Sequence, residues 1–282
     1  MKPFIKYPGG KLKEFPLVDK FKPALISRYF EPFVGGASIY LNIDVLDSYI
    51  NDKSEDLTNL YIFVKNQDEL FEFLKPFAGL NPYLKIGMEI FYKEGPQLVK
   101  KLKEQGFKIF LDLKLHDIPN TVEKAMRNIA SLGVEITNLH AAGGIKMMEA
   151  ARRGLDSTLE GKKTQLIAVT QLTSTSQDVL ENELLINKPL NEVVKQYALN
   201  AKAAGLQGVV CSPLEAPIIK ELGLLSVTPG IRFADDSAND QKRIATPAYA
   251  KELGSDYIVV GRSITGASDP VAAYKKCVEE FC

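Results

Sequence analysis

The stretch "GFKIFLDLKLHDIPNTVEKAMRNIASLGVEITNLHAA", residues 106–142, contains the pattern that decides the fold of this chain. An apolar run at 108–115 is followed by the amphipathic stretch 121–133 and then by a second apolar run at 135–142. These periodicities are typical of a strand, a surface helix and another strand. Because strands that alternate with helices pair in parallel, the stretch predicts one β–α–β unit of a parallel sheet.

The same unit recurs from residue 83 to the end of the chain. Strands are predicted at 83–90, 108–115, 135–142, 164–172, 208–212, 224–231 and 256–261, with amphipathic helices between them. A (β/α)8 TIM barrel needs one more strand, so we predict an α/β barrel whose first strand is replaced or missing. The apolar run 60–64, "LYIFV", is the candidate substitute, and we expect it to pair between 83–88 and 256–260.

Charge and cysteine content narrow the class of protein. The 282 residues include 35 basic and 35 acidic side chains, so we expect neither nucleic acid nor a membrane as a partner. No apolar run approaches the roughly 18 residues of a membrane span, and the first residues lack a signal-peptide pattern, which predicts a cytoplasmic protein. Three cysteines and two histidines without metal-ligand spacing predict neither a disulfide framework nor a zinc site.

Charged side chains gather where the strand 108–115 ends. Alternation along the strand directs Asp112 and Lys114 toward the barrel interior. Active sites of this fold lie at the carboxyl ends of the strands, where Asp117 also falls. Because isolated buried ions are costly, we expect a lysine between two carboxylates, with Lys85 from the preceding strand as a fourth member. A buried ion-pair network that only fixes packing is the structural alternative.

The last two strands predict a phosphate site. In this fold, phosphate is often bound by the loops after strands 7 and 8, which here contain "TPGIR" and "VVGRSI". Gly230 and Gly261 would allow close backbone approach, and Arg232 and Arg262 would supply guanidinium groups. The alternative for either arginine alone is a solvated surface charge.

The N-terminal region differs from the rest of the chain. Residues 1–58 contain two glycine-rich turns, and the second follows "RYFEPFV" (28–34), which is typical of a strand that enters a tight loop. Such a unit is a candidate nucleotide cradle, although an ordinary turn would use glycine in the same way. We predict a small α/β appendage over 1–58 and a barrel over 59–282.

Seven strings along the chain resemble orotidine 5′-phosphate decarboxylases. They are DLKLHDIPNT (112–121), NLHAAGG (138–144), AVTQLTSTS (168–176), GVVCSP (208–213), VTPGIR (227–232), NDQKR (239–243) and IVVGRSIT (258–265). The resemblance covers about residues 69–282. It implies a homodimeric barrel that removes CO2 from orotidine 5′-phosphate to give UMP in pyrimidine biosynthesis, with no metal and no organic cofactor.

The resemblance also implies roles for individual residues. Lys85, Asp112 and Lys114 would form the charged array of one subunit, with Lys114 as proton donor to the carbanion. Asp117 would be shared across the dimer interface. The other expected substrate contacts are Ile118 and Thr121 in the neighbouring site, Thr173 and Ser174 by the pyrimidine, and Arg232, Gln241, Gly261 and Arg262 at the phosphate.

The first quarter of the chain resembles a different family. PFIKYPGGK (3–11), YFEPFVGGASIYLN (29–42) and YINDKSEDLTNLY (49–61) are similar to S-adenosylmethionine-binding motifs of DNA adenine-N6 methyltransferases. The matching residues are Tyr7, Gly9, Gly10, Lys11, Glu31, Pro32, Phe33, Gly35, Gly36 and Asp52. The catalytic motif of that family is absent, so the resemblance over about residues 1–68 implies a chimeric fusion.

The fusion affects the expected activity. In the decarboxylase family, the first strand carries an aspartate that binds the ribose hydroxyls, and the register of 60–64 puts Phe63 at that position. We therefore expect impaired turnover. Two alternatives remain: an S-adenosylmethionine-binding fragment fused to an inactive barrel, and a Mg²⁺-dependent sugar-phosphate decarboxylase or aldolase with the same Asp-x-Lys-x-x-Asp array.

Overall fold

The computed structural model describes residues 28–31, 47–50, 67–80, 82–234 and 245–282. The chain forms two compact units, residues 1–75 and 76–282. In the first unit, β1 (Arg28–Glu31) pairs in parallel with β2 (Asp47–Ile50), and α3 (Gln67–Leu74) follows. The strand predicted within "RYFEPFV" is confirmed, whereas the predicted strand 60–64 lies outside the described residues. The boundary between residues 58 and 59 stays a prediction.

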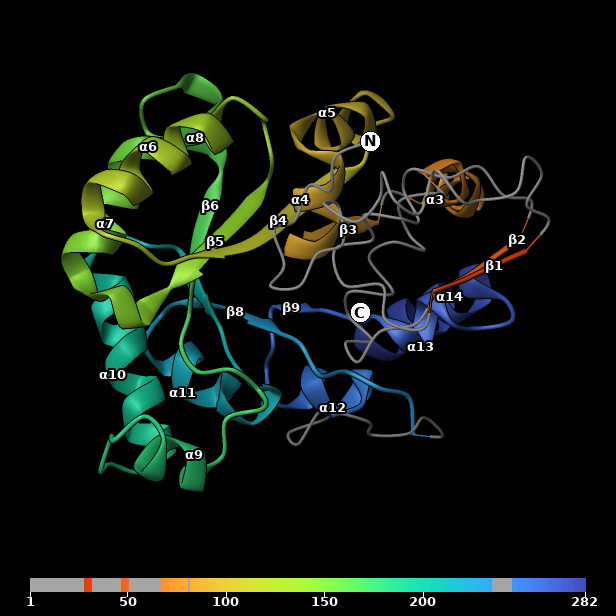
Figure 1. Ribbon diagram of the computed structural model, residues 1–282. Coiled ribbons are helices and arrows are strands. Elements are labelled where there is room, and N and C mark those ends of the chain that lie inside the picture. Colours follow the sequence, from red (N-terminus) through yellow and green to blue (C-terminus); the bar gives the residue numbers. More distant parts are fainter. Residues whose placement is uncertain (1–27, 32–46, 51–66, 81, 235–244) are drawn as a thin grey trace. The chain divides into compact units, whose positions relative to one another are not determined.

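The second unit is built on one parallel sheet of seven described strands (Figure 1). The strands are β3 (Tyr83–Gly87), β4 (Lys108–Leu115), β5 (Ile136–His140), β6 (Gln165–Val169), β7 (Gly208–Val210), β8 (Leu225–Thr228) and β9 (Tyr257–Ile258). Each strand pairs with the next in the chain, in the order β3-β4-β5-β6-β7-β8-β9. The predicted alternation of parallel strands and helices is confirmed.

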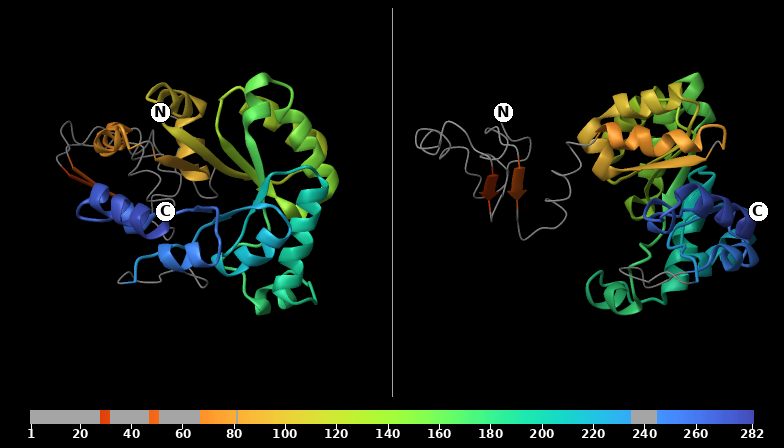
Figure 2. Two further views of the ribbon diagram at one scale, coloured as in Figure 1. Left: turned by 180° about the vertical axis from the view of Figure 1, so that it is seen from behind. Right: turned by 90° about the vertical axis from the view of Figure 1, so that its right-hand side faces the viewer.

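Helices connect the strands and lie on the outside of the curled sheet (Figure 2). They are α4 (Met88–Glu94), α5 (Pro96–Glu104), α6 (Pro119–Ala130), α7 (Gly144–Leu155), α8 (Leu159–Lys163), α9 (Gln177–Asn182), α10 (Leu190–Ala203), α11 (Ala216–Glu221), α12 (Pro247–Glu252), α13 (Arg262–Thr265) and α14 (Pro270–Phe281). Short 3-10 turns occupy Lys75–Phe77, Ala141–Gly143 and Pro213–Glu215. No helix in the described ranges is long and apolar enough to cross a membrane.

Six of the seven predicted strands are longer than the observed strands, and 108–115 alone among them has the predicted bounds. The strand predicted at 83–90 ends at Gly87, because Gly87 is the N-cap of α4 and residues 88–90 are already helical. The strand predicted at 256–261 is reduced to Tyr257–Ile258. In both cases apolar residues continue past the strand, although Met88 is 42% exposed, so an apolar run by itself does not mark where a strand ends.

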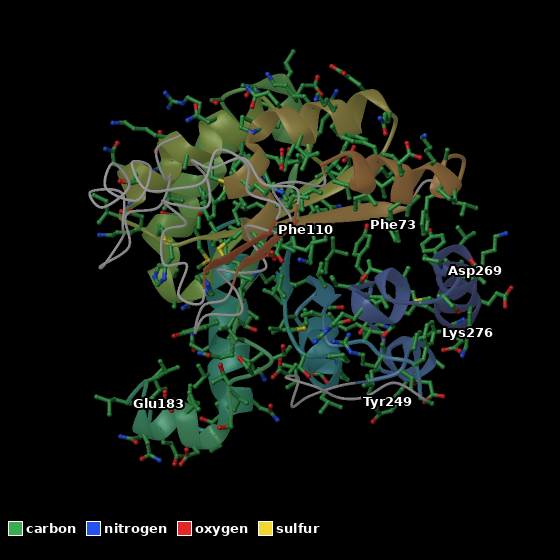
Figure 3. All side chains as sticks on the ribbon, turned by 45° about the vertical axis from the view of Figure 1, so that its right-hand side comes forward. Phe73, Phe110, Glu183, Tyr249, Asp269 and Lys276 are labelled. Atoms are coloured by element: carbon green, nitrogen blue, oxygen red, sulfur yellow. The ribbon has the colours of Figure 1, made fainter. Side chains whose placement is uncertain are left out.

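An apolar cluster fills the interior of the sheet. Phe110, Ile136, Ile167 and Val227, from β4, β5, β6 and β8, pack together and are at most 5% exposed. Phe110, labelled in Figure 3, lies on β4, next to the end strand β3 of the described sheet. Because side chains alternate along a strand, Asp112 on β4 shares the interior face with Phe110, as predicted from the sequence.

The sheet curls far enough to bring its two end strands near each other. The rings of Tyr83 on β3 and Tyr257 on β9 meet edge to face, with centroids 6.1 Å apart. An aromatic pair of this geometry adds about 0.5–1.5 kcal/mol beyond the area it buries. The described strands therefore form a TIM-barrel-like fold that is partly open, with β3 and β9 on either side of the seam.

The amino-terminal ends of three strand pairs are joined by a recurring side-chain contact, here called the strand clamp. The residue just before β5, β7 or β9 accepts a hydrogen bond from the second residue of the preceding strand. The three bonds run from Ile109 N to Glu135 Oε2 (2.7 Å), from Leu166 N to Gln207 Oε1 (2.8 Å) and from Ser226 N to Asp256 Oδ2 (2.8 Å). Each clamp satisfies a main-chain N–H at the strand entrance.

Candidate active site

An ion-paired cluster lies at the carboxyl ends of β3 and β4. Asp112 is 7% exposed, and its Oδ1 is 2.6 Å from Lys114 Nζ. Its Oδ2 is 3.1 Å from Nζ of Lys85, which comes from β3. The described contacts therefore place one carboxylate between two lysines, which is the reverse of the expected lysine between two carboxylates.

Asn138 is a member of this cluster that the sequence interpretation missed. It lies on β5 and is completely buried, and its Nδ2 donates to Asp112 Oδ1 at 2.7 Å. The sequence pattern could have identified this residue, because alternation along β5 puts Asn138 on the same interior face as Ile136. A polar amide on the inner face of a buried strand requires partners, and here the partners belong to the candidate site.

The cluster keeps Asp112 ionised. Burial raises the pKa of this carboxyl, but Lys85, Lys114 and the hydrogen bond from Asn138 outweigh it, so the pKa lies below the ordinary value. A carboxylate that stays charged next to two ammonium groups holds them at short range. Lys85 and Lys114 remain accessible at the mouth of the sheet, with 38% and 25% of their side chains exposed.

The two histidines of the chain lie beside this cluster. The rings of His116 and His140 have centroids 5.6 Å apart. Burial, followed by the proximity of His116 and Lys114, lowers the pKa of His140, which is therefore neutral at physiological pH. Within the described ranges, no group of three or more His, Cys, Asp or Glu side chains is arranged to hold a metal ion.

Asp117 does not join the charged cluster through any described contact of its own chain. It lies in the turn before α6, where its Oδ1 accepts a hydrogen bond from Ile118 N at 2.6 Å. Ile118 is 66% exposed, and Thr121 in the first turn of α6 is exposed as well. All three predicted residues are therefore available to a second molecule.

A cavity of about 530 Å³ opens beside the loop that follows β6. Ser174 lines it, together with Thr170 and Gln171 at the end of β6 and His140 at the end of β5. Thr173 neighbours Ser174 in the chain and is partly buried. The predicted pyrimidine-binding pair therefore lies on the loop between β6 and α9, and Ser174 lines a cavity that His140 also borders.

The predicted phosphate residues fall at the ends of β8 and β9. Arg232 is 7% exposed, and its segment is anchored where Arg232 N donates to Ala245 O at 3.0 Å. Gly230 has a φ of +84°, a conformation that favours glycine. Gly261 is the N-cap of α13, and Arg262 begins that helix with an exposed side chain. Gln241 lies outside the described residues.

The fold and the cluster together define an α/β-barrel protein with a charged site at the carboxyl ends of its strands, where enzymes of this architecture bind substrate. The sequence model of the "Orotidine 5'-phosphate decarboxylase / HUMPS family" matches residues 44–277. The chain belongs to this family. The match also includes residues 44–68, which were assigned above to the methyltransferase-like segment. The comparisons give no support to the resemblance of that segment to methyltransferases.

Individual relatives agree with the family. The chain is 56% identical over 221 residues to orotidine 5′-phosphate decarboxylase of Bacillus caldolyticus, covering 77% of this chain and 91% of that protein. It is 54% identical over 221 residues to the enzyme of the same name from Geobacillus thermodenitrificans, covering 77% and 92%. The crystal structure of orotidine 5′-phosphate decarboxylase from Lactobacillus acidophilus matches with a TM-score of 0.67 and 45% identity, over 76% of this chain and 94% of that one.

Proposed function

We propose that this chain decarboxylates orotidine 5′-phosphate to UMP in the cytoplasm, as a step of pyrimidine biosynthesis. The observation that carries the proposal is the ammonium of Lys114, held 2.6 Å from the buried carboxylate of Asp112 at the mouth of the barrel. The names of the relatives, at 54% and 56% identity, support the same activity.

The proposed mechanism follows from the negative charge that loss of CO2 leaves on the pyrimidine ring. The bond between the pyrimidine ring and its carboxylate breaks, CO2 leaves, and the electron pair stays on the ring carbon. Lys114 meets this charge with a fixed ammonium and then donates its proton to the same carbon, which gives UMP. A preorganised charge of this kind stabilises the transition state without reorganisation during the reaction.

The proposed substrate contacts are distributed over several loops. Thr173 and Ser174 bind the pyrimidine, Arg232, Gln241, Gly261 and Arg262 bind the phosphate, and a second copy contributes Asp117, Ile118 and Thr121. Phosphate binding far from the reacting carbon supplies energy that is used at that carbon. Phe63 lies outside the described residues. Because the register of 60–64 predicts this residue at the position of the family's ribose-binding aspartate, we expect Phe63→Asp to raise kcat/KM by about one to two decades.

The test is the fall in absorbance as orotidine 5′-phosphate becomes UMP. We expect Lys114→Ala to lower kcat by at least about 10²-fold, the loss typical of removing one preorganised charge or donor. Lys163→Ala is the matched control, because Lys163 is an exposed lysine paired only locally with Glu160. Equal rates for wild type and Lys114→Ala would refute the proposal. Loss of turnover in EDTA would instead favour the Mg²⁺-dependent sugar-phosphate alternative.

A further inference from the structure

The ladder between β4 and β5 contains a bulge at the candidate site. Leu111 pairs with Thr137 and Leu115 pairs with Leu139, and the register shifts between these pairs. Three residues of β4, 112–114, therefore face the single residue Asn138 of β5. A bulge redirects side chains and leaves main-chain groups without ladder partners, so each such group needs another partner.

Lys114 adopts an unusual backbone conformation within this bulge. Its φ is +49°, in the left-handed region that residues with a Cβ rarely occupy. Such a conformation is strained and persists only where the surroundings hold it. The main-chain N–H of Lys114 donates to Asn138 Oδ1 at 2.8 Å. This bond replaces the ladder bond that the bulge removes.

The other end of the same amide binds the carboxylate. Asn138 Nδ2 donates to Asp112 Oδ1 at 2.7 Å, and Lys114 Nζ donates to the same oxygen at 2.6 Å. We infer that Asn138 is a positioning residue for the decarboxylation, which fixes the backbone of Lys114 and the carboxylate of Asp112 together so that the ammonium has one orientation. The inference rests on the proposed function, in which Lys114 is the proton donor.

The amide is suited to both bonds. Position 138 must offer a donor to Asp112 and an acceptor to the N–H of Lys114, and a side-chain amide provides one of each. Aspartate at this position would keep the acceptor but place a second carboxylate against Asp112. Leucine would keep the approximate volume and remove both bonds. Asn138→Asp therefore tests the effect of an added charge, and Asn138→Leu tests the loss of both hydrogen bonds.

The experiment compares Asn138→Leu and Asn138→Asp with Thr137→Val. Thr137 is an equally buried neighbour on β5, and its hydroxyl donates to Leu111 O at 3.0 Å rather than to a member of the charged cluster. We expect Asn138→Leu to lower kcat on the order of 10²-fold with little change in KM, because misplacing a catalytic group acts on the transition state. In Asn138→Asp, the acid limb of the kcat profile should move to higher pH, since a like charge raises the pKa of a carboxyl.

A second readout does not depend on turnover. Amide hydrogen exchange at Lys114 should be slow in wild type and in Thr137→Val, and faster in Asn138→Leu, because only that variant loses the acceptor. The inference is overturned if Asn138→Leu keeps slow exchange at Lys114, or if its kcat falls no further than that of Thr137→Val. Absence of turnover in the wild type would refute the proposed function instead, and the exchange result would still decide whether Asn138 holds the main chain of Lys114.

Discussion

Asp112 sets the electrostatics of the site at the scale of single residues. Asp112 is 7% exposed, and its carboxylate is stabilised by contacts with Lys85, Lys114 and Asn138. The two lysines would otherwise face each other across a small volume with like charges. The aspartate therefore contributes to the stability of the barrel as well as to the orientation of the Lys114 side chain.

Asp112→Asn should destabilise the protein near neutral pH by about 3 kcal/mol, because it leaves two neighbouring ammonium groups without their carboxylate. The folded-state pKa of Asp112 is depressed below 3.8, so its contribution is full above that value and is lost as pH falls through the folded pKa. The difference from wild type in urea unfolding should accordingly narrow in acid. A difference that is constant with pH would contradict this account, and Glu160→Gln in an exposed pair should leave stability nearly unchanged.

The strand clamps stabilise the barrel at the scale of elements. They occur at β4–β5, β6–β7 and β8–β9, so the device repeats with every second strand. The position that would continue the pattern before β3 is occupied by Pro82, whose side chain has no acceptor. The clamps lie at the end of the strands opposite to the charged cluster.

Glu135, the acceptor of the β4–β5 strand clamp, offers the best test of this stabilising role. Its Oε1 pairs with Lys103 and its Oε2 accepts from Ile109 N at 2.7 Å. We expect Glu135→Ala to lower the free energy of unfolding by about 1–3 kcal/mol, because the N–H of a buried residue loses its partner. Glu135→Gln keeps an acceptor and should cost less. Thermal unfolding measures both, and turnover below the transition should stay at the wild-type level, so a loss of kcat in folded Glu135→Ala would contradict the assignment.

At the scale of the whole molecule, the exposed start of α6 and the charged cluster favour a second copy of the chain as partner. Asp117, Ile118 and Thr121 lie exposed at the start of α6, while the described contacts of the charged cluster include one carboxylate for two lysines. A second copy that brings its Asp117 to this cluster would restore the second carboxylate predicted from the sequence. We propose a homodimer with two such shared sites.

Complementation tests the shared site. Lys114→Ala and Asp117→Ala should each be nearly inactive alone. After their subunits are mixed and allowed to exchange, half of the dimers are mixed and each has one intact site, so about a quarter of the wild-type activity should return. Mixing Lys114→Ala with Asp112→Ala is the control, because both changes affect the same array and no intact site can form. Absence of recovery in exchanged dimers would refute the sharing of Asp117.

Local patterns were sufficient to predict much of this molecule. The alternation in 108–115 predicted that Asp112 and Lys114 share the interior face, and their 2.6 Å contact agrees. The recurring β–α unit predicted seven parallel strands in chain order, which the sheet contains. These features depend on periodicity within a segment or on the succession of segments, and both can be read from the chain itself.

Contacts between segments were decided only by the tertiary structure. Asn138 joins Asp112 and Lys114 because the β4–β5 register shifts at this point, and the left-handed backbone of Lys114 follows from the same bulge. The periodicity of either strand alone does not specify a bulge, since it depends on hydrogen bonds between residues 24 to 26 positions apart. The sequence by itself therefore determined the elements and the charged residues at their ends, whereas the pairing of the strands determined which side chain contacts both Asp112 and the main chain of Lys114.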